Sequence, residues 1–158
     1  MARVLSFWYN YKYVRTLSLL LVSEAINNNV YKNGYYSAIA NSRQMENDIT
    51  YFLEFMGSII LKYSKVYINF YSILEKLKGR GVFLNRSTEL VLKNVLSLPR
   101  LNDEYFDWRD YINFTNDDFT KQYYFKLLNE LEELNILLTK EHKNAKLFKL
   151  NTKEWDLM

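Results

Sequence analysis

The chain has 158 residues, of which 49% are hydrophobic, 25% charged and 17% aromatic. This composition excludes intrinsic disorder, which is typical of chains with few hydrophobic and aromatic residues. The sequence contains no cysteine, which excludes a disulfide framework, a thiolate zinc site and a cysteine nucleophile. A net charge of +3 permits nucleic-acid binding but does not require it. One proline and four glycines favour a mainly helical protein.

The sequence shows no strong targeting signal. The apolar run nearest its start, Leu17–Val22, is too short to span a membrane and is soon followed by Glu24. It also lacks a convincing cleavage site for a secretory signal. The sequence therefore predicts a cytoplasmic protein with no membrane partner.

Helical periodicity dominates the first half of the chain. Apolar residues recur at spacings of three and four over Val14–Ile26, and Asn27–Asn29 should end this helix. A shorter helix is expected around Tyr35–Ser42. Asp48 can then cap a long helix of about 30 residues, or roughly 45 Å at 1.5 Å per residue. Its continuous apolar stripe predicts a buried face, and Gly79 is the expected left-handed residue at its end.

Two glycines around Arg80 mark the predicted division of the chain. The part before Arg80 carries 9 basic and 5 acidic groups, a net charge of +4. The part from Arg80 onward carries 12 basic and 13 acidic groups, a net charge of −1. We therefore predict a helical domain at residues 1–78, a linker at residues 79–86 and a second domain at residues 87–158.

The second half predicts the order helix, helix, turn, helix and hairpin, which is typical of a winged helix-turn-helix. Ser87 can cap a helix that ends before Pro99, and a short helix should begin near Trp108. Thr120 opens a helix whose leucines lie on one face. The hairpin is expected to comprise strands Ile136–Thr139 and Lys146–Leu150 and the loop Lys140–Asn144. The predicted fold class is therefore mainly α, with one short β-hairpin.

The sequence provides little catalytic chemistry. Its single histidine, His142, lies in the predicted hairpin loop, so this chain alone can build neither a catalytic triad nor a multi-histidine metal site. The glycines at positions 34, 57, 79 and 81 match no phosphate-binding loop. The residues themselves therefore predict no catalytic group, no metal ligand and no cofactor.

A winged helix would use residues 120–134 as its recognition helix, with the N-terminal end in the major groove. In that position glutamine can read adenine, lysine can read guanine and tyrosine can reach a phosphate, while lysines of the wing bind phosphates. The predicted contacts with duplex DNA are Lys121, Gln122, Tyr123 and Lys126 on the helix, and Lys143 and Lys146 on the wing. Against strong binding are Glu130, Glu132 and Glu133 on the same helix. We therefore expect weak or degenerate binding, as a dimer or at a specific site.

Two segments of the first half resemble the region that follows the active site of Fic-family proteins. That family typically shows a Tyr-Tyr-x-Ala-Leu-like segment, then Asp-x-Thr-x-Phe-x-x-Phe at the start of a long helix. The matching segments here are Asn33–Ser42, with Tyr35-Tyr36-Ser37-Ala38-Ile39, and Asn47–Met56, with Asp48-Ile49-Thr50-Tyr51-Phe52. The resemblance covers residues 1–78 and implies the helical half of a Fic-type domain. The second half is similar to the winged-helix modules that are often appended to Fic domains.

Residues Met1–Ser6 resemble the end of the family's active-site signature, His-x-Phe-x-Asp/Glu-Gly-Asn-Gly/Lys-Arg followed by two residues and a second arginine. Arg3 corresponds to this second arginine, whose family role is to contact the terminal phosphates of the nucleotide. Family members transfer AMP, or another phosphate-bearing group, from a nucleotide to a protein hydroxyl. The resemblance implies that ATP and Mg²⁺ serve only a complete family member. It also implies a catalytically inactive C-terminal portion, arising from a fragment, a split gene or a misplaced start codon.

Three functions remain open at this point. The first is the non-catalytic C-terminal portion of a Fic-type adenylyltransferase, with the missing catalytic half as a partner and a winged-helix module that binds either DNA or protein. The second is a free-standing winged-helix DNA-binding regulator, in which residues 1–78 form a helical platform for homodimerisation or for binding an effector. The third is a helical interaction protein that binds neither nucleotide nor DNA. A His-Pro-Phe and Gly-Asn-Gly-Arg sequence encoded just upstream of Met1 would select the first.

Overall fold

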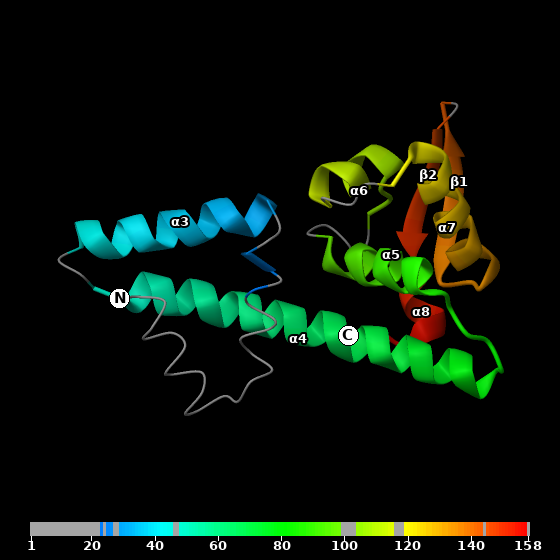
Figure 1. Ribbon diagram of the computed structural model, residues 1–158, viewed down its shortest axis with the longest axis horizontal. Helices are drawn as coiled ribbons and strands as arrows, with labels where there is room; N and C mark the ends of the chain where they lie inside the picture. Colours follow the sequence, from blue (N-terminus) through cyan, green and yellow to red (C-terminus); the bar gives the residue numbers. More distant parts are fainter. Residues whose placement is uncertain are drawn as a thin grey trace. The chain divides into compact units, whose positions relative to one another are not determined.

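The computed structural model describes residues 23, 25–26, 29–45, 48–98, 104–115, 119–143 and 145–157. This described part is mainly helical and contains one two-stranded antiparallel hairpin, which confirms the coarse fold class (Figure 1). Its contacts divide into two compact units, Met1–Ser64 and Lys65–Met158. Among the described residues, no helix has the length and apolar character needed to cross a membrane. Arg3, most of the predicted helix over 14–26 and the predicted turn at 116–118 lie outside the described residues.

The first unit contains helix α3 (Asn29–Gln44) and the start of helix α4 (Thr50–Gly79). α4 begins as predicted, because the Asp48 carboxylate accepts hydrogen bonds from the hydroxyl of Thr50 at 2.6 Å and from its amide at 2.9 Å. These two bonds lower the pKa of Asp48 below its ordinary value. α3 is longer than the predicted helix at 35–42, since it already begins at Asn29.

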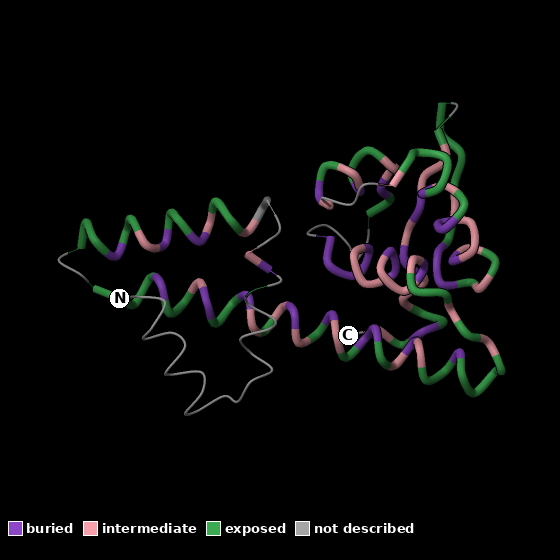
Figure 2. The backbone as a smooth tube through the Cα atoms, viewed as in Figure 1, coloured by how far each residue is buried: buried purple, intermediate pink, exposed green. Residues whose placement is uncertain are grey.

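Aromatic rings hold α3 against the first turns of α4. The rings of Tyr35 and Phe52 meet edge to face with 5.9 Å between their centroids, and Tyr31 meets Tyr63 in the same way at 5.9 Å. Figure 2 shows the buried residues of this unit gathered along one face of each helix. The apolar stripe of α4 is therefore core in this unit, as predicted, with Phe52, Met56, Ile59 and Tyr63 all buried.

Gly34 allows α3 and α4 to approach closely. A Cβ atom at this position would lie 2.7 Å from the ring of Phe55, which is closer than real Cβ contacts. Any larger residue at position 34 would therefore require the Phe55 ring to move. The glycine is a packing residue, so its place in the sequence reflects the neighbouring helix and not a turn.

The end of α4 corrects one prediction. The left-handed residue is Gly81, with φ of 74°, and not Gly79, which belongs to the helix. The amide of Val82 donates to the Leu77 carbonyl at 3.0 Å, and the amide of Gly81 donates to the Lys78 carbonyl at 3.0 Å. These two bonds form a Schellman motif, in which the left-handed residue follows the helix end.

The second unit begins within α4 at Lys65, earlier than the predicted linker at 79–86. Its other elements are α5 (Arg86–Ser97), α6 (Trp108–Phe114), α7 (Lys121–Glu133), β1 (Leu137–His142), β2 (Ala145–Leu150) and α8 (Thr152–Trp155). The difference arises because the last turns of α4 contact the end of the chain. Lys76 Nζ donates to the Trp155 carbonyl at 2.8 Å, and the Arg80 guanidinium lies 4.9 Å from the centroid of the Trp155 ring.

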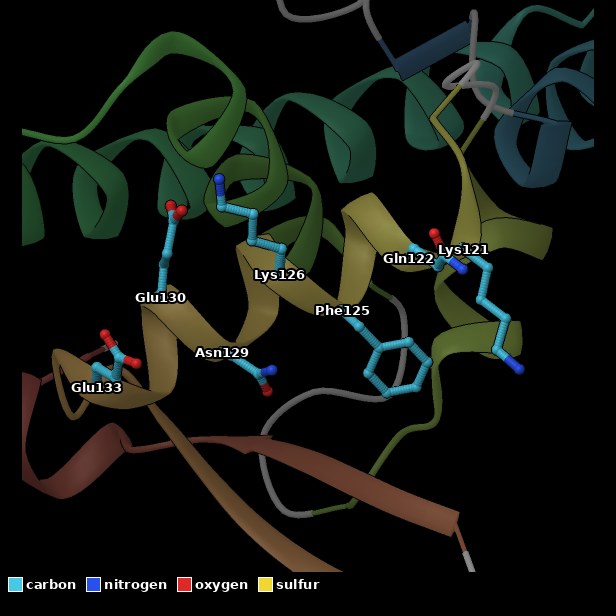
Figure 3. A pocket seen from close by; sticks show the side chains of 7 residues that line it. All are labelled: Lys121, Gln122, Phe125, Lys126, Asn129, Glu130 and Glu133. Atoms are coloured by element: carbon cyan, nitrogen blue, oxygen red, sulfur yellow. The ribbon is translucent and has the colours of Figure 1, made fainter.

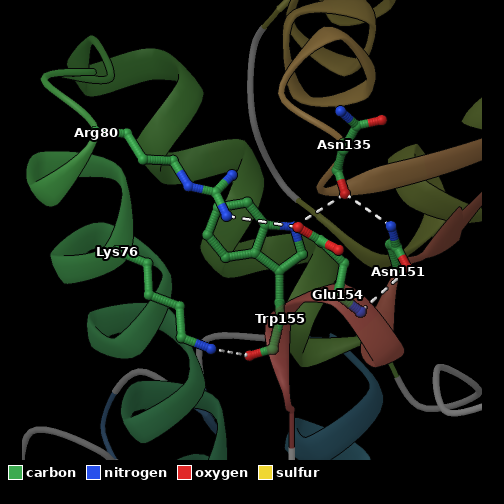
Figure 4. A network of polar contacts seen from close by, with 6 residues as sticks. All are labelled: Lys76, Arg80, Asn135, Asn151, Glu154 and Trp155. Atoms are coloured by element: carbon green, nitrogen blue, oxygen red, sulfur yellow. Dashed lines mark hydrogen bonds and ion pairs between the residues drawn. The ribbon is translucent and has the colours of Figure 1, made fainter.

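Trp155 is fully buried and anchors α8 to the base of the hairpin (Figure 4). Its indole N–H donates to the Asn135 carbonyl at 2.9 Å. The Asn151 side-chain amide donates to the same carbonyl at 3.1 Å. Arg80, beside the ring, also pairs with Glu154 at 3.4 Å across the surface. The last turns of α4 and α8 therefore share one polar network over one aromatic side chain.

The core of the second unit lies between α5, α7 and the hairpin. α6 covers one side of it, with the ring of Tyr111 edge to face against Tyr124 at 5.0 Å. The fully or nearly fully buried apolar side chains of this unit are Ile73, Leu77, Val91, Leu92, Val95, Tyr111, Tyr124, Leu127, Leu128, Leu131, Ile136, Leu137, Phe148 and Trp155. Burying an aliphatic or aromatic side chain stabilises the fold by roughly 1.5–3 kcal/mol, so this cluster dominates the unit's stability.

The start of α5 corrects a second prediction. Asn85 caps the helix, because its side-chain oxygen accepts from the Thr88 amide at 2.9 Å while its own backbone is extended. The predicted cap, Ser87, lies inside the first turn. Asparagine and serine cap helices about equally well, so residue type alone does not choose between the two positions.

The starts of α6 and α7 agree with the sequence. α6 begins at Trp108 with a capping box, in which Asp107 accepts from the amide of Asp110 and the Asp110 carboxylate accepts from the amide of Asp107. α7 begins after Thr120, whose hydroxyl accepts from the Tyr123 amide at 3.4 Å. In both cases a side chain satisfies an amide that the helix leaves without a partner.

The hairpin is longer than predicted. The paired residues run without a break from Leu137↔Leu150 to His142↔Ala145. Most of the predicted loop at 140–144 is therefore strand, and Lys143, with φ of 45°, stands in the turn. A connection this short sets the register directly, and backbone pairing then extends through polar residues that carry no strand signal of their own.

One further backbone pairing joins the segment between α5 and α6 to the hairpin. Phe106 forms an antiparallel bridge with Phe148 of β2, with both N–H···O distances at 2.8 Å. The two rings also pack together, with 6.0 Å between centroids. Sequence periodicity did not predict this bridge, because a single paired residue leaves no repeating pattern.

Candidate nucleic-acid interface

α7 separates a buried face from an exposed one. Its leucines and Tyr124 point into the core. Lys121, Gln122, Tyr123 and Lys126 are all exposed, so the structure brings the four predicted helix contacts together on the first two turns. The Thr120 cap determines where the helix starts and therefore which residues occupy these turns.

An open hollow of about 810 Å³ runs along the outer side of α7 (Figure 3). It is lined by Lys121, Gln122, Phe125, Lys126, Asn129, Glu130 and Glu133. Three of the predicted contacts line it, whereas Tyr123 does not and instead packs edge to face on Phe119 at 5.1 Å. The hollow is basic at the N-terminal end of the helix and acidic at its C-terminal end.

Aromatic rings position the basic end of α7. The Lys121 ammonium lies 4.5 Å from the ring centroid of Trp108 on α6 and 5.9 Å from that of Phe125. The Arg109 guanidinium lies 5.7 Å from the same Trp108 ring. Two cations from two helices therefore flank one indole. No local sequence pattern indicates Arg109 and Trp108 as part of this face, because only the packing of α6 beside α7 brings them to this position.

The acidic residues of α7 are largely occupied by contacts inside the unit. Glu130 accepts from the Thr88 hydroxyl at 2.7 Å, which ties α7 to α5. Glu132 accepts from the Lys146 ammonium and from the Thr139 hydroxyl, which ties α7 to the hairpin. These two bonds lower the pKa of Glu132 below its ordinary value, and the bond from Lys146 has the larger effect.

The two predicted wing lysines have different surroundings. Lys143 is exposed in the hairpin turn, where a phosphate could reach it. Lys146 belongs to β2 and pairs with Glu141 of β1. Its ammonium donates to the Glu132 carboxylate and, at 2.9 Å, to the side-chain oxygen of Asn129. The structure therefore places Lys143 at the tip of the hairpin and Lys146 against the side of α7.

The described residues contain no group of three or more His, Asp or Glu side chains that could hold a metal ion. His142 is exposed at the end of β1, opposite Ala145. Arg3 lies outside the described residues. No family model matches this chain, and no curated protein or solved structure matches it either.

Proposed function

We propose that the second unit is a winged-helix module that binds duplex DNA with the outer face of α7 and the tip of the hairpin. The Phe106–Phe148 bridge is the observation that carries this proposal. It pairs a single residue between α5 and α6 with β2, at the place where a winged helix has its first strand, and so supports the order helix, strand, helix, helix, strand, strand. Winged helices have this order, with the third helix as the reading helix and the hairpin as the wing.

The distribution of charge supports the same proposal better than the net charge does. Lys121, Lys126 and Arg109 gather at the N-terminal end of α7, which is the end that a reading helix inserts into the major groove. Glu132, which counted against DNA binding, is paired with Lys146. Basic side chains therefore gather at this end of the helix although the half of the chain from Arg80 onward carries a net charge of −1.

The roles of the exposed residues follow from their chemistry. Gln122 and Lys126 are one helical turn apart on the outer face, so both can reach base edges in one groove. Lys143 at the hairpin tip suits a phosphate, to which a lysine binds as a point charge. Lys121, held beside Trp108, suits a phosphate next to the helix start.

The test measures binding of the full chain to duplex DNA, selected from a randomised pool, at several salt concentrations. Two to three neutralised phosphates predict a slope of about −2 to −3 in log affinity against log salt. The double variant Lys121→Glu with Lys126→Glu should abolish binding. The matched control, Lys65→Glu with Lys153→Glu, changes two exposed lysines outside this face by the same charge and should leave most of the affinity. Undetectable binding, or binding that salt leaves unchanged, would overturn the proposal.

We also propose that the first unit is the helical part that follows the active site in a Fic-type adenylyltransferase. The packing of the two resembling segments supports this proposal. Tyr35 and Ala38 of the first segment are buried, and the Tyr35 ring lies against Phe52 of the second. Asp48 and Thr50, the first two positions of the Asp-x-Thr-x-Phe pattern, together cap α4.

These 158 residues are not expected to transfer AMP on their own. Their single histidine, His142, lies on the hairpin of the second unit, and the sequence contains no Gly-Asn-Gly-Arg phosphate loop. Incubation with labelled ATP, Mg²⁺ and cell lysate should therefore label no protein above background. A labelled band that disappears in the Arg3→Ala variant would contradict this expectation.

A further inference from the structure

The hydrogen bonds of Lys146 point to a role other than phosphate binding. Its ammonium donates to Asn129 Oδ1 at 2.9 Å and to the Glu132 carboxylate, and both acceptors are on α7. The Lys146 and Glu132 side chains keep only 32% and 31% of their exposure, so the pair is partly shielded from solvent. A residue of β2 therefore fixes two side chains of the neighbouring helix.

This arrangement determines which end of the Asn129 amide is available to a ligand. An asparagine side chain has an acceptor oxygen and a donor NH₂ group, and a lysine ammonium can only donate. The Asn129 oxygen therefore faces Lys146. Within the described part of the chain, no group accepts a hydrogen bond from Asn129 Nδ2. Among the described residues, the donor end is therefore left for a ligand.

Asn129 lies on the face of α7 that the proposed function assigns to DNA. It lines the same hollow as Gln122 and Lys126, and Figure 3 shows the three side chains along one helix. The three residues are spaced by four and then three positions, which keeps them on one side of a helix. At 1.5 Å per residue they span about 10.5 Å, close to three base-pair steps of about 3.4 Å.

We propose that Asn129 is a third base-reading residue and that Lys146 is a positioning residue, which makes Asn129 a reader of hydrogen-bond acceptors. This inference rests on the proposed DNA binding. Guanine presents two acceptors, N7 and O6, in the major groove, whereas adenine presents an acceptor beside a donor and cytosine a donor. Lys146 occupies one lone pair of the Asn129 oxygen and orients it toward β2, which disfavours the two-bond contact with adenine. The module therefore prefers guanine to adenine at the base pair that faces Asn129.

The test begins with the full chain and its best duplex, in which each base pair is replaced in turn by the other three. The wild-type chain should prefer guanine to adenine at one position by about tenfold. Asn129→Asp keeps an oxygen for Lys146 and replaces the donor by a second acceptor. Since a carboxylate accepts from cytosine N4, the preference at that position should move from guanine to cytosine.

A second pair of variants separates positioning from phosphate binding. Lys146→Met removes the ammonium and keeps an apolar stem, so it should reduce the preference for guanine over adenine to within about twofold while leaving the salt slope unchanged. Lys143→Met should do the opposite, reducing the magnitude of the salt slope by about 0.9 without changing the base preference. Thermal unfolding monitored by circular dichroism checks that each variant is folded.

The base preferences and salt slopes of these variants test the roles of Asn129 and Lys146. Unchanged base preference in Asn129→Asp, or a salt slope that Lys146→Met weakens as much as Lys143→Met does, would overturn the inference while DNA binding survives. A wild-type chain without salt-dependent binding would overturn both proposals together. If Lys146→Met does not fold, the preference of Asn129→Asp decides alone, because that variant retains the contact with Lys146.

Discussion

Glu132 joins three elements of the second unit through one carboxylate. It belongs to α7, and it accepts hydrogen bonds from Lys146 on β2 and Thr139 on β1. A charged acceptor with two donors stabilises the fold more than a neutral one, because charge-assisted bonds are stronger. The same residue holds the lysine that orients Asn129. Glu132 therefore matters both for the position of the hairpin and for the chemistry that α7 presents.

The lowered pKa of Glu132 predicts a contribution to acid stability. Because the folded-state pKa lies below the unfolded one, the contribution is complete above the unfolded value and is lost as pH falls through the folded value. Between about pH 5 and pH 3, the free energy of unfolding should fall for the wild type and fall less for Glu132→Gln. The two decreases should differ by an amount on the order of 1 kcal/mol. Urea unfolding at several pH values measures this difference.

Glu133→Gln is the matched control for this measurement. It removes a carboxylate from the same helix turn, at an exposed site where the described residues supply no hydrogen-bond donor. Its unfolding should follow the wild-type dependence on pH. If both variants changed the dependence equally, the carboxylate–lysine pair would not be the source of the effect.

At the scale of elements, the two glycines near the end of α4 have different roles. Gly81 has φ of 74°, a conformation that costs about 1 kcal/mol or more for a residue with a Cβ atom. Gly79 lies in the helix, where glycine is about 0.5–1 kcal/mol less favourable than alanine. No atom lies within 4 Å of a Cβ added at either position, so only the backbone distinguishes them.

This difference gives a prediction with an internal control. Gly81→Ala should lower the free energy of unfolding by about 1 kcal/mol, and Gly79→Ala should raise it by about 0.5–1 kcal/mol. The urea midpoints of the two variants, measured beside the wild type, test both values. Changes of the same sign would contradict the assignment of Gly81 as the residue that ends the helix.

The starts of α4, α6 and α7 were predictable from the sequence, whereas the start of α3 and the length of the hairpin were not. Asp48, Thr120 and the helix at Trp108 follow from local rules, because a cap needs only a side-chain oxygen and amides two or three residues ahead. The capping residue of α5 was not predictable in this way, because Asn85 and Ser87 are equally suitable caps two positions apart. The extra length of the hairpin depends on pairing with β2, which a local pattern does not contain.

At the scale of the whole chain, tertiary contacts decide where the second unit begins. The sequence placed the boundary at the glycines, whereas the compact unit already includes α4 from Lys65. Trp155 explains the difference, because Lys76 and Arg80 both contact it from the last turns of α4. A flexible linker would leave these contacts unmade. The Phe106–Phe148 bridge is a contact of the same kind, since it joins residues 42 positions apart.

The helical class, the order of the elements up to the hairpin, the capping residues Asp48 and Thr120 and the exposed face of α7 follow from the sequence, whereas α8 (Thr152–Trp155) was not predicted. These features depend on periodicity and on neighbours within four residues, both of which can be read along the chain. Three contacts depend on tertiary packing alone: the bridge at Phe106, the place of Trp108 beside Lys121 and the contact of Lys146 with Asn129. The physical reason is that each of these joins residues of different elements. Which partners meet depends on how the faces of those elements pack, and no local spacing records that choice.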